Sequence, residues 1–171
     1  MTASGIVCLL LAAPSAHAGL GGSPMTPPSD ASITVRTVQP GARATDASQS
    51  PLNAAASAAS TGTSTATPYT VRETTLGNGT VVREYLAQNG TVFGIAWQGP
   101  QMPDLAQLLD GYFPQYVAGV QAVHAQRGAR GPVALDGAGL VVHSSGHMGS
   151  FAGQAWLPQA LPAGVSGSDI Q

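Results

Sequence analysis

The sequence contains no lysine, a single cysteine and few charged or aromatic residues. Only 8% of its 171 residues are charged, and six arginines against eight carboxylates leave a formal net charge of −2. A protein that binds nucleic acid or anionic lipid needs a concentrated positive surface, which this composition does not supply. Nucleic acid is therefore not expected as a partner, and the length indicates one domain.

The N-terminal segment is typical of a secretory signal peptide. Residues 1–18, MTASGIVCLLLAAPSAHA, join a short apolar run to a small-x-small ending at Ala16 and Ala18. Cleavage there predicts an exported protein, periplasmic or extracellular, whose mature chain begins at Gly19. A lipid-anchored Cys8 is the competing interpretation, but GIVC lacks the leucine usually found three residues before such a cysteine. We favour a soluble exported protein.

Removal of residues 1–18 has two consequences. The mature chain contains no cysteine, which excludes a disulfide, a thiol nucleophile and a thiolate metal ligand. It also contains no integral membrane segment, because even the removed apolar run is shorter than the roughly 20 residues that span a bilayer.

Residues 19–68 are mostly Ala, Ser, Thr, Pro and Gly, with few large apolar side chains. Such a composition buries too little apolar surface to offset the entropy of ordering the backbone. We therefore predict a flexible arm. One island, SITVRTVQ at 32–39, alternates like a strand; it either adds an edge strand or belongs to the arm.

Residues 69–99 hold three runs rich in β-branched and aromatic residues, separated by GNG and QNG. Asn-Gly is a strong hairpin signal, so we predict a three-stranded antiparallel meander. A three-residue GNG loop would set Glu73 opposite Arg83, whereas a two-residue loop would set it opposite Glu84. Cross-strand attraction favours the longer loop, which also pairs Arg72 with Glu84. Both turns spell NGT, which we interpret as turn chemistry rather than as glycan sites.

The third strand has unequal faces, and a broken helix follows it. Phe93, Ile95 and Trp97 alternate with smaller residues and are predicted to share the core face. After them, MPDLAQLLDGYFPQYVAGVQAVHAQRG places Pro and Asp at helix-start positions and repeats leucines at helical spacing. Gly111 and Pro114 are expected to break this helix into two segments.

The segment GLVVHSSGHMGSFAGQAW is predicted to form a strand, a turn and a second strand. A two-residue turn at 145–146 puts His143 and His147 on opposite faces. If the strand instead runs on, the two imidazoles share a face about 13 Å apart at ~3.3 Å per residue. Either geometry keeps them off one metal ion, whose nitrogen ligands lie about 2 Å away, so no metal site is predicted.

A Ser-His-Asp set can be named from Ser145, His143 and either Asp110 or Asp136, but no catalytic motif accompanies these histidines. The sequence lacks Gly-x-Ser-x-Gly, H-E-x-x-H and a P-loop, so we assign no catalytic residue and no cofactor. The predicted fold class is α+β: residues 69–171 form an antiparallel sheet of about five strands with the broken helix packed on one face. The side chains that we consider for binding are Tyr85, Trp97, His143, His147 and Trp156.

The strings TVVREY, AWQGP and AWLPQALPAGV resemble the family of small exported bacterial proteins catalogued as the domain of unknown function numbered 2844. The similarity covers about the last hundred residues together with the segment GLGGSPMTPPSDAS. No activity, ligand or catalytic residue is attached to that family. The resemblance therefore implies membership of this family but no biochemical mechanism.

Two functions from different classes remain. The first is a non-catalytic periplasmic or cell-surface module that binds a protein or envelope component through its sheet; it rests on the signal peptide, the arm and the missing catalytic motifs. The second is a small hydrolase that uses a histidine of the 143–147 hairpin near a carboxylate. A pocket that brings a histidine, a carboxylate and backbone donors within hydrogen-bond reach would distinguish them.

Overall fold

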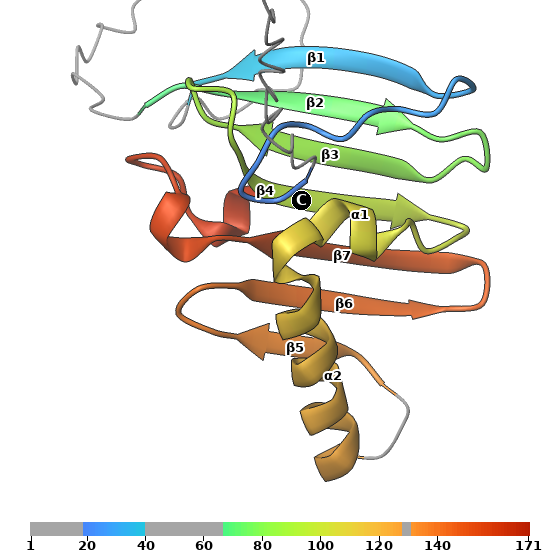
Figure 1. Cartoon of the computed structure of the whole chain (residues 1–171). Coiled ribbons are helices and arrows are strands. Elements are labelled where there is room, and N and C mark those ends of the chain that lie inside the picture. The colour runs from blue at the N-terminus through green and yellow to red at the C-terminus, as the bar shows by residue number, and fades with distance from the viewer. Residues whose placement is uncertain (1–18, 40–66, 128–130) are drawn as a thin grey trace, which may run out of the picture.

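The computed structural model describes residues 19–39, 67–127 and 131–171, which form a seven-stranded antiparallel sheet with helices on one face (Figure 1). The predicted α+β class is confirmed, but the sheet has seven strands rather than about five, because one further strand joins each edge. The strand order is β1-β2-β3-β4-β7-β6-β5. In chain order the strands are β1 (Ser32–Val38), β2 (Tyr69–Thr75), β3 (Val81–Leu86), β4 (Val92–Gly99), β5 (Val133–Asp136), β6 (Val141–His147) and β7 (Ser150–Trp156).

Strands β2 to β4 form the predicted meander. Glu73 pairs with Arg83 and Arg72 pairs with Glu84, as the charge argument predicts. Between β2 and β3, Leu76 N donates to Thr80 O at 2.8 Å, so the loop closes over the three residues 77–79. The last of them, Gly79, has a φ of 82°, a conformation that glycine adopts without steric cost.

The asparagine of each NGT turn bonds to the backbone of its own turn. Asn78 Oδ1 accepts a hydrogen bond from Thr80 N at 2.9 Å, and Asn89 Oδ1 accepts one from Thr91 N at 3.0 Å. These bonds close the loop over two residues, as is typical of Asx turns. They support the interpretation of both motifs as turn chemistry.

A bulge corrects the predicted faces of β4. The pairing between β3 and β4 shifts by one residue at Leu86, which leaves Phe93 as an extra residue on β4. Phe93 therefore packs beside Tyr85 on one face of the sheet, whereas Ile95 and Trp97 lie in the core on the other. The prediction that all three share a face is wrong, because strict alternation does not continue across a bulge.

The helix is broken where the sequence predicts. Helix α1 (Leu105–Leu109) is followed by a 3₁₀ turn, η1 (Asp110–Tyr112), and then by α2 (Phe113–Arg127). Asp104 caps α1, because its Oδ1 accepts hydrogen bonds from Ala106 N at 2.9 Å and Gln107 N at 3.2 Å.

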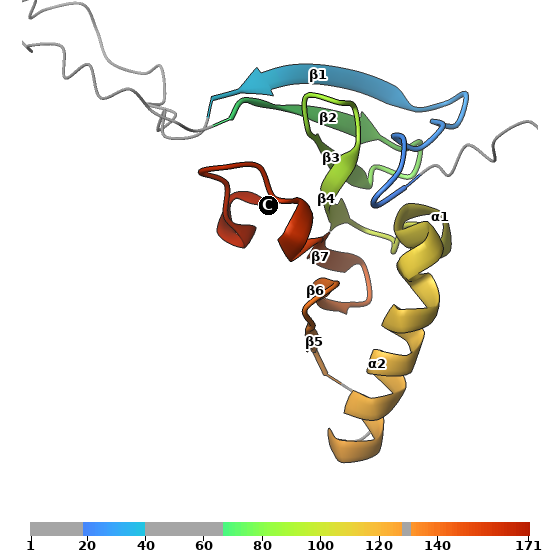
Figure 2. The ribbon, with the colours of Figure 1, turned by 60° about the vertical axis from the view of Figure 1, so that its left-hand side comes forward.

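Both faces of the sheet are covered (Figure 2). On the helix face, the helices and residues 19–31 enclose a core of Leu20, Met25, Val82, Val92, Ile95, Trp97, Leu105, Leu108, Leu109, Leu140, Val142, Ala155 and Leu157. On the opposite face, here called the tail face, residues 157–171 with the 3₁₀ turns η2 (Pro158–Ala160) and η3 (Gly167–Asp169) cover a cluster of Tyr69, Val71, Tyr85, Phe93, Ala96 and Ile170.

The C-terminal hairpin of β6 and β7 turns later than predicted. Its turn is at 148–149 rather than at 145–146, and the glycine at 149 has a φ of 81°. Gly146 stays in the strand, where a β-carbon would lie 2.6 Å from Phe151 Cδ1. His143 and His147 therefore lie on the same face of one strand, which is the alternative geometry considered from the sequence.

Residues 19–39 belong to the fold and not to a flexible arm. Leu20 and Met25 are 2% and 4% exposed in the core of the helix face. The island at 32–39 is the edge strand β1, which pairs with β2 over its whole length. The prediction failed because it used the average composition of residues 19–68, in which the two buried side chains Leu20 and Met25 have little weight. The predicted signal peptide, 1–18, and residues 40–66 of the predicted arm lie outside the described residues.

Candidate functional site

A row of side chains crosses the tail face from one edge of the sheet to the other. Directly paired residues of antiparallel strands point to the same side, so the register alone places these residues in line. They come from segments far apart in the sequence. The row consists of Thr34, Glu73, Arg83, Ala96, Gln154, His143 and Ala134.

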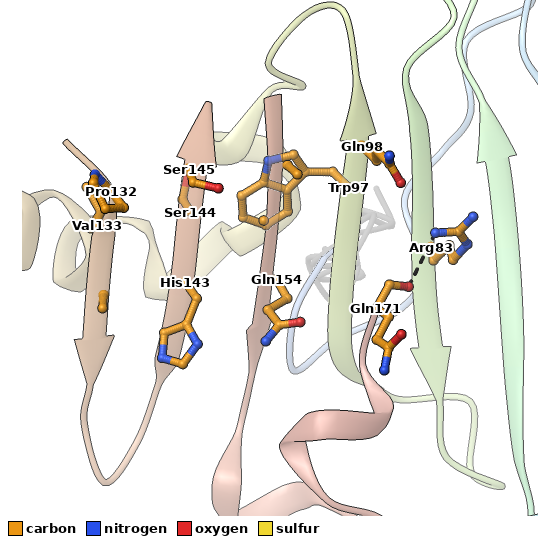
Figure 3. Close-up of a pocket in the computed structure, with 13 residues that line it drawn as sticks. Arg83, Trp97, Gln98, Pro132, Val133, His143, Ser144, Ser145, Gln154 and Gln171 are labelled. Atoms are coloured by element: carbon orange, nitrogen blue, oxygen red, sulfur yellow. Dashed lines mark hydrogen bonds between the residues drawn. The ribbon is translucent and has the colours of Figure 1, made fainter. Parts of the chain in front are cut away.

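Beside the C-terminal segment this row opens into a groove of about 410 Å³ (Figure 3). Small side chains of β5 and β7 line it together with amide groups, one histidine and one arginine. Among the described residues that line it, none has a carboxylate side chain. The lining consists of Arg83, Trp97, Gln98, Pro132, Val133, Ala134, His143, Ser144, Ser145, Ala152, Gly153, Gln154 and Gln171.

Arg83 carries the cation of the groove, and two contacts hold it in place. Its Nε lies 2.7 Å from Glu73 Oε2, and its Nη1 donates to the Gln171 carbonyl oxygen at 3.3 Å (Figure 3). The guanidinium charge is therefore compensated by a carboxylate outside the groove. The groove itself presents hydrogen-bond donors and acceptors with little net charge.

His143 is oriented by a carboxylate and by an aromatic ring. Its Nε2 lies 2.9 Å from Asp136 Oδ1, and its ring meets the Trp156 ring edge to face with centroids 5.3 Å apart. When Nε2 donates to Asp136, Nδ1 is left as an acceptor. Within the described residues no hydroxyl group is hydrogen-bonded to His143, so the pair lacks the nucleophile of a hydrolytic triad.

Tyr85 anchors the C-terminal segment and does not line this groove. Its hydroxyl donates to the Gln171 carbonyl oxygen at 2.8 Å and accepts from Gln171 N at 2.9 Å. Burial raises the pKa of the Tyr85 phenol above its ordinary value of 10.0. The phenol therefore stays neutral and holds the chain end beside Arg83.

The other aromatic and histidine candidates lie in different surroundings. Trp97 points to the helix face and is almost fully buried, although its ring against Gly153 contributes to the groove lining. His147 is exposed near the end of the hairpin, where its Nδ1 lies 3.2 Å from the Met148 carbonyl oxygen. Of the sequence-based candidates, Trp97 and His143 line the groove, and Trp156 contacts the ring of His143.

A second, more polar groove of about 770 Å³ lies on the same face and shares Arg83 and Gln171 with the first. Its lining includes two positively charged residues, Arg36 and Arg83, and two negatively charged ones, Glu73 and Asp169. The lining consists of Thr34, Arg36, Tyr69, Glu73, Arg83, Tyr85, Asp169 and Gln171.

Sequence reasoning did not place the arginine and the three glutamines of the first groove, Arg83, Gln98, Gln154 and Gln171, at a site. It named Asp136 as a possible partner of His143, and the structure places the two side chains together. The alternation of β3 could have placed Arg83 on the face of Tyr85. Gln154 could not be paired with His143 while the hairpin turn stood at 145–146.

The described ranges hold no group of three or more His, Cys, Asp or Glu side chains that could bind a metal ion. They also hold no helix long and apolar enough to cross a membrane.

The family model described as "Protein of unknown function (DUF2844)" matches residues 16–170. No curated protein and no solved structure matches the chain.

Proposed function

The chain belongs to the DUF2844 family, and since this membership brings no activity with it, we propose that the protein is an exported, non-catalytic binding module. Its ligand is a neutral polysaccharide chain of the cell envelope, which it holds in the 410 Å³ groove of the tail face. The proposed location is the periplasm or the cell surface.

The near-neutral amide lining of the groove carries this proposal. Gln98, Gln154 and Gln171 each offer both a donor and an acceptor, which suits a ligand rich in hydroxyl groups. A phosphate or carboxylate ligand would need an uncompensated cation, whereas Arg83 is already paired with Glu73 at 2.7 Å. Arg83 and Gln171 line both this groove and the second one, so an extended polymer has room to continue from one groove into the other.

A small hydrolase is the second candidate, and the bond between His143 and Asp136 favours it. A carboxylate that orients an imidazole supplies two of the three members of a catalytic triad. The nearest serine on the same face is Ser145, two residues along β6, which is roughly 6.6 Å of strand. Catalysis would require a ligand-induced approach of these two side chains.

The test of the binding proposal is co-sedimentation of the purified protein with neutral envelope polysaccharide. Ala152→Leu fills the floor of the groove, and Gln154→Ala removes an amide from it. We expect each variant to weaken binding at least tenfold, which corresponds to about 1.4 kcal/mol. His147→Gln is the matched control, because His147 is a neighbouring strand residue outside the groove, and it should bind like the wild type.

Two results would contradict the proposal. Undiminished binding by both groove variants would place the ligand elsewhere. Turnover of an ester or glycoside substrate that disappears in both His143→Gln and Ser145→Ala, but persists in His147→Gln, would establish the hydrolase instead.

A further inference from the structure

Gly19, the residue that follows the predicted cleavage site, is a fixed part of the fold. It is buried, and its backbone nitrogen donates to the Ser23 carbonyl oxygen at 2.7 Å. Its φ is 146°, and a β-carbon would lie 2.7 Å from the Gln107 oxygen and 2.8 Å from the Leu108 oxygen. Only glycine satisfies both the backbone conformation and the close approach.

The residues after Gly19 hold it in this place. Leu20 N donates to the Leu108 carbonyl oxygen at 2.8 Å, and Gly21 N donates to Val92 O at 2.8 Å. The Leu20 side chain is 2% exposed in the core. The position of the Gly19 nitrogen is thus set by contacts to α1 and β4.

The surroundings of Gly19 suit a positive charge. The last carbonyl groups of a helix lack intrahelical partners and form the negative end of its dipole, and those of Gln107 and Leu108 face Gly19. The Asp110 side chain begins 3.2 Å from the position of a Gly19 β-carbon. Asp110 is also the one non-glycine residue with positive φ, 42°, among the described residues. A backbone strained in this way is kept in place by its surroundings.

We propose that cleavage between Ala18 and Gly19 is a maturation step, and that the new α-ammonium group of Gly19 binds in this preformed site. In the cleavage, water is the co-reactant: the C–N bond between Ala18 and Gly19 breaks, the water oxygen joins the Ala18 carbonyl carbon, and Ala18 is left as a carboxylate. Both water hydrogens end on the Gly19 nitrogen, so that the peptide nitrogen, with one hydrogen, becomes an ammonium group with three. This inference rests on the export in the proposed function, because export is what exposes the bond to a signal peptidase.

The gain from cleavage follows from counting donors and charge. The peptide nitrogen donates one hydrogen bond, to Ser23, whereas the ammonium group has two further hydrogens for the Gln107 carbonyl oxygen and for the Asp110 carboxylate. A buried ammonium group is costly unless it is paired, and here the helix end and Asp110 compensate it. Since Leu20 is buried beside the bond, cleavage must precede the docking of this segment.

The test compares the thermal melting of two purified chains, one beginning at Gly19 and one retaining Ala18, at neutral pH and low salt. We expect the Gly19 chain to melt roughly 3 °C higher. In an Asp110→Asn background this difference should largely disappear. Asp136→Asn is the matched control: its carboxylate lies on the tail face, and the difference should persist.

Equal melting temperatures of the two chains would overturn the inference, and so would a difference that survives Asp110→Asn unchanged. N-terminal sequencing of the exported protein supplies an independent check, since any first residue other than Gly19 would overturn it as well. Retention of the uncleaved chain in the cytoplasm contradicts the proposed export, while the melting comparison still decides whether the ammonium site exists.

Discussion

At the residue scale, Glu84 is a buried charge that ties the N-terminal segment to the sheet. Its side chain is fully buried; Oε1 accepts from Met25 N at 2.7 Å, whereas Oε2 lies 3.6 Å from Arg72 Nη1. Arg72 and Glu84 therefore form an ion pair, but the distance between their atoms is too long for a hydrogen bond. Burial raises the pKa of Glu84 above its ordinary 4.5, against the opposing effects of the Met25 N–H and of Arg72.

This shift predicts how stability depends on pH. Between pH 4.5 and the raised value, folded Glu84 holds a proton that the unfolded chain has released. The free energy of unfolding therefore rises as the pH falls through that window. Glu84→Gln cannot titrate, so the wild type should gain stability relative to this variant as the pH is lowered towards 4.5. Urea denaturation at a series of pH values measures the difference.

Two further variants make the pH prediction specific. Thr74→Val is the control, because it changes a fully buried polar side chain of the neighbouring strand β2 without removing a titratable group, and it should keep the wild-type pH dependence. Glu84→Ala should lose about 2 kcal/mol, since the buried Met25 N–H is left without its acceptor. Identical pH profiles for the wild type and Glu84→Gln would show that Glu84 does not titrate as proposed.

At the element scale, β1 and the segment before it form one unit that is joined to the rest by contacts distant in sequence. β1 pairs with β2 along its length, although its own Ile33 and Val35 remain 45% and 61% exposed at the edge. The anchors of the unit are Leu20 and Met25 in the core. The unit is therefore held mainly by its backbone pairing and by Leu20 and Met25, while Val38 is the apolar side chain of β1 that packs against a buried cluster.

A cut in the chain between this unit and β2 should leave the protein assembled. We predict that cleavage at a protease site inserted within residues 40–66 gives two fragments that elute together in gel filtration and separate only in denaturant. Leu20→Ala combined with Met25→Ala should release the smaller fragment, because each truncation costs about 2–5 kcal/mol. Dissociation of the unsubstituted fragments would show that β1 needs its covalent link.

At the scale of the whole molecule, the sheet is stable because it is covered on both faces by segments that are not strands. The C-terminal segment supplies the smaller cluster, in which Ile170 is fully buried against Gly94. The neighbouring Gln171 is exposed but bonds through its backbone to Tyr85. The end of the described chain is therefore structural, and it also forms one side of the groove.

Ile170→Ala should destabilise the whole protein and not the tail alone. We expect a loss of about 2–5 kcal/mol, because a fully buried side chain is truncated next to three packed aromatic rings. Gln171→Ala keeps the backbone bonds to Tyr85 and should change stability by less than about 0.5 kcal/mol. Thermal unfolding followed by tryptophan fluorescence and by far-UV circular dichroism should give one coincident transition. A separate early transition for Ile170→Ala would mean that the two faces unfold independently.

The sequence by itself determined the features that neighbouring residues control. The NGT turns, the pairing of Glu73 with Arg83, the Asp104 cap and the break after α1 all depend on residues within about ten positions of one another. Their physical causes are turn conformation, charge opposition across a hairpin and helix capping. These causes act between residues that are close in the sequence, so a local sequence pattern is enough to predict the turns, the charge pair and the cap.

Only the tertiary structure decided the folding of residues 19–39, the side of Phe93 and the lining of the groove. Met25 meets Glu84 across 59 positions, and Tyr85 meets Gln171 across 86. The bulge on β4 puts Phe93 in the cluster of the tail face, and Gly146 lies in β6, where a β-carbon would be 2.6 Å from Phe151 Cδ1. His143 was identified from the sequence and Asp136 was named as one of two possible carboxylate partners, but the sequence did not choose between Asp110 and Asp136 and did not pair His143 with Gln154. Their positions follow from a register that long-range packing selects, because apolar burial on both faces outweighs the local preference of a polar turn.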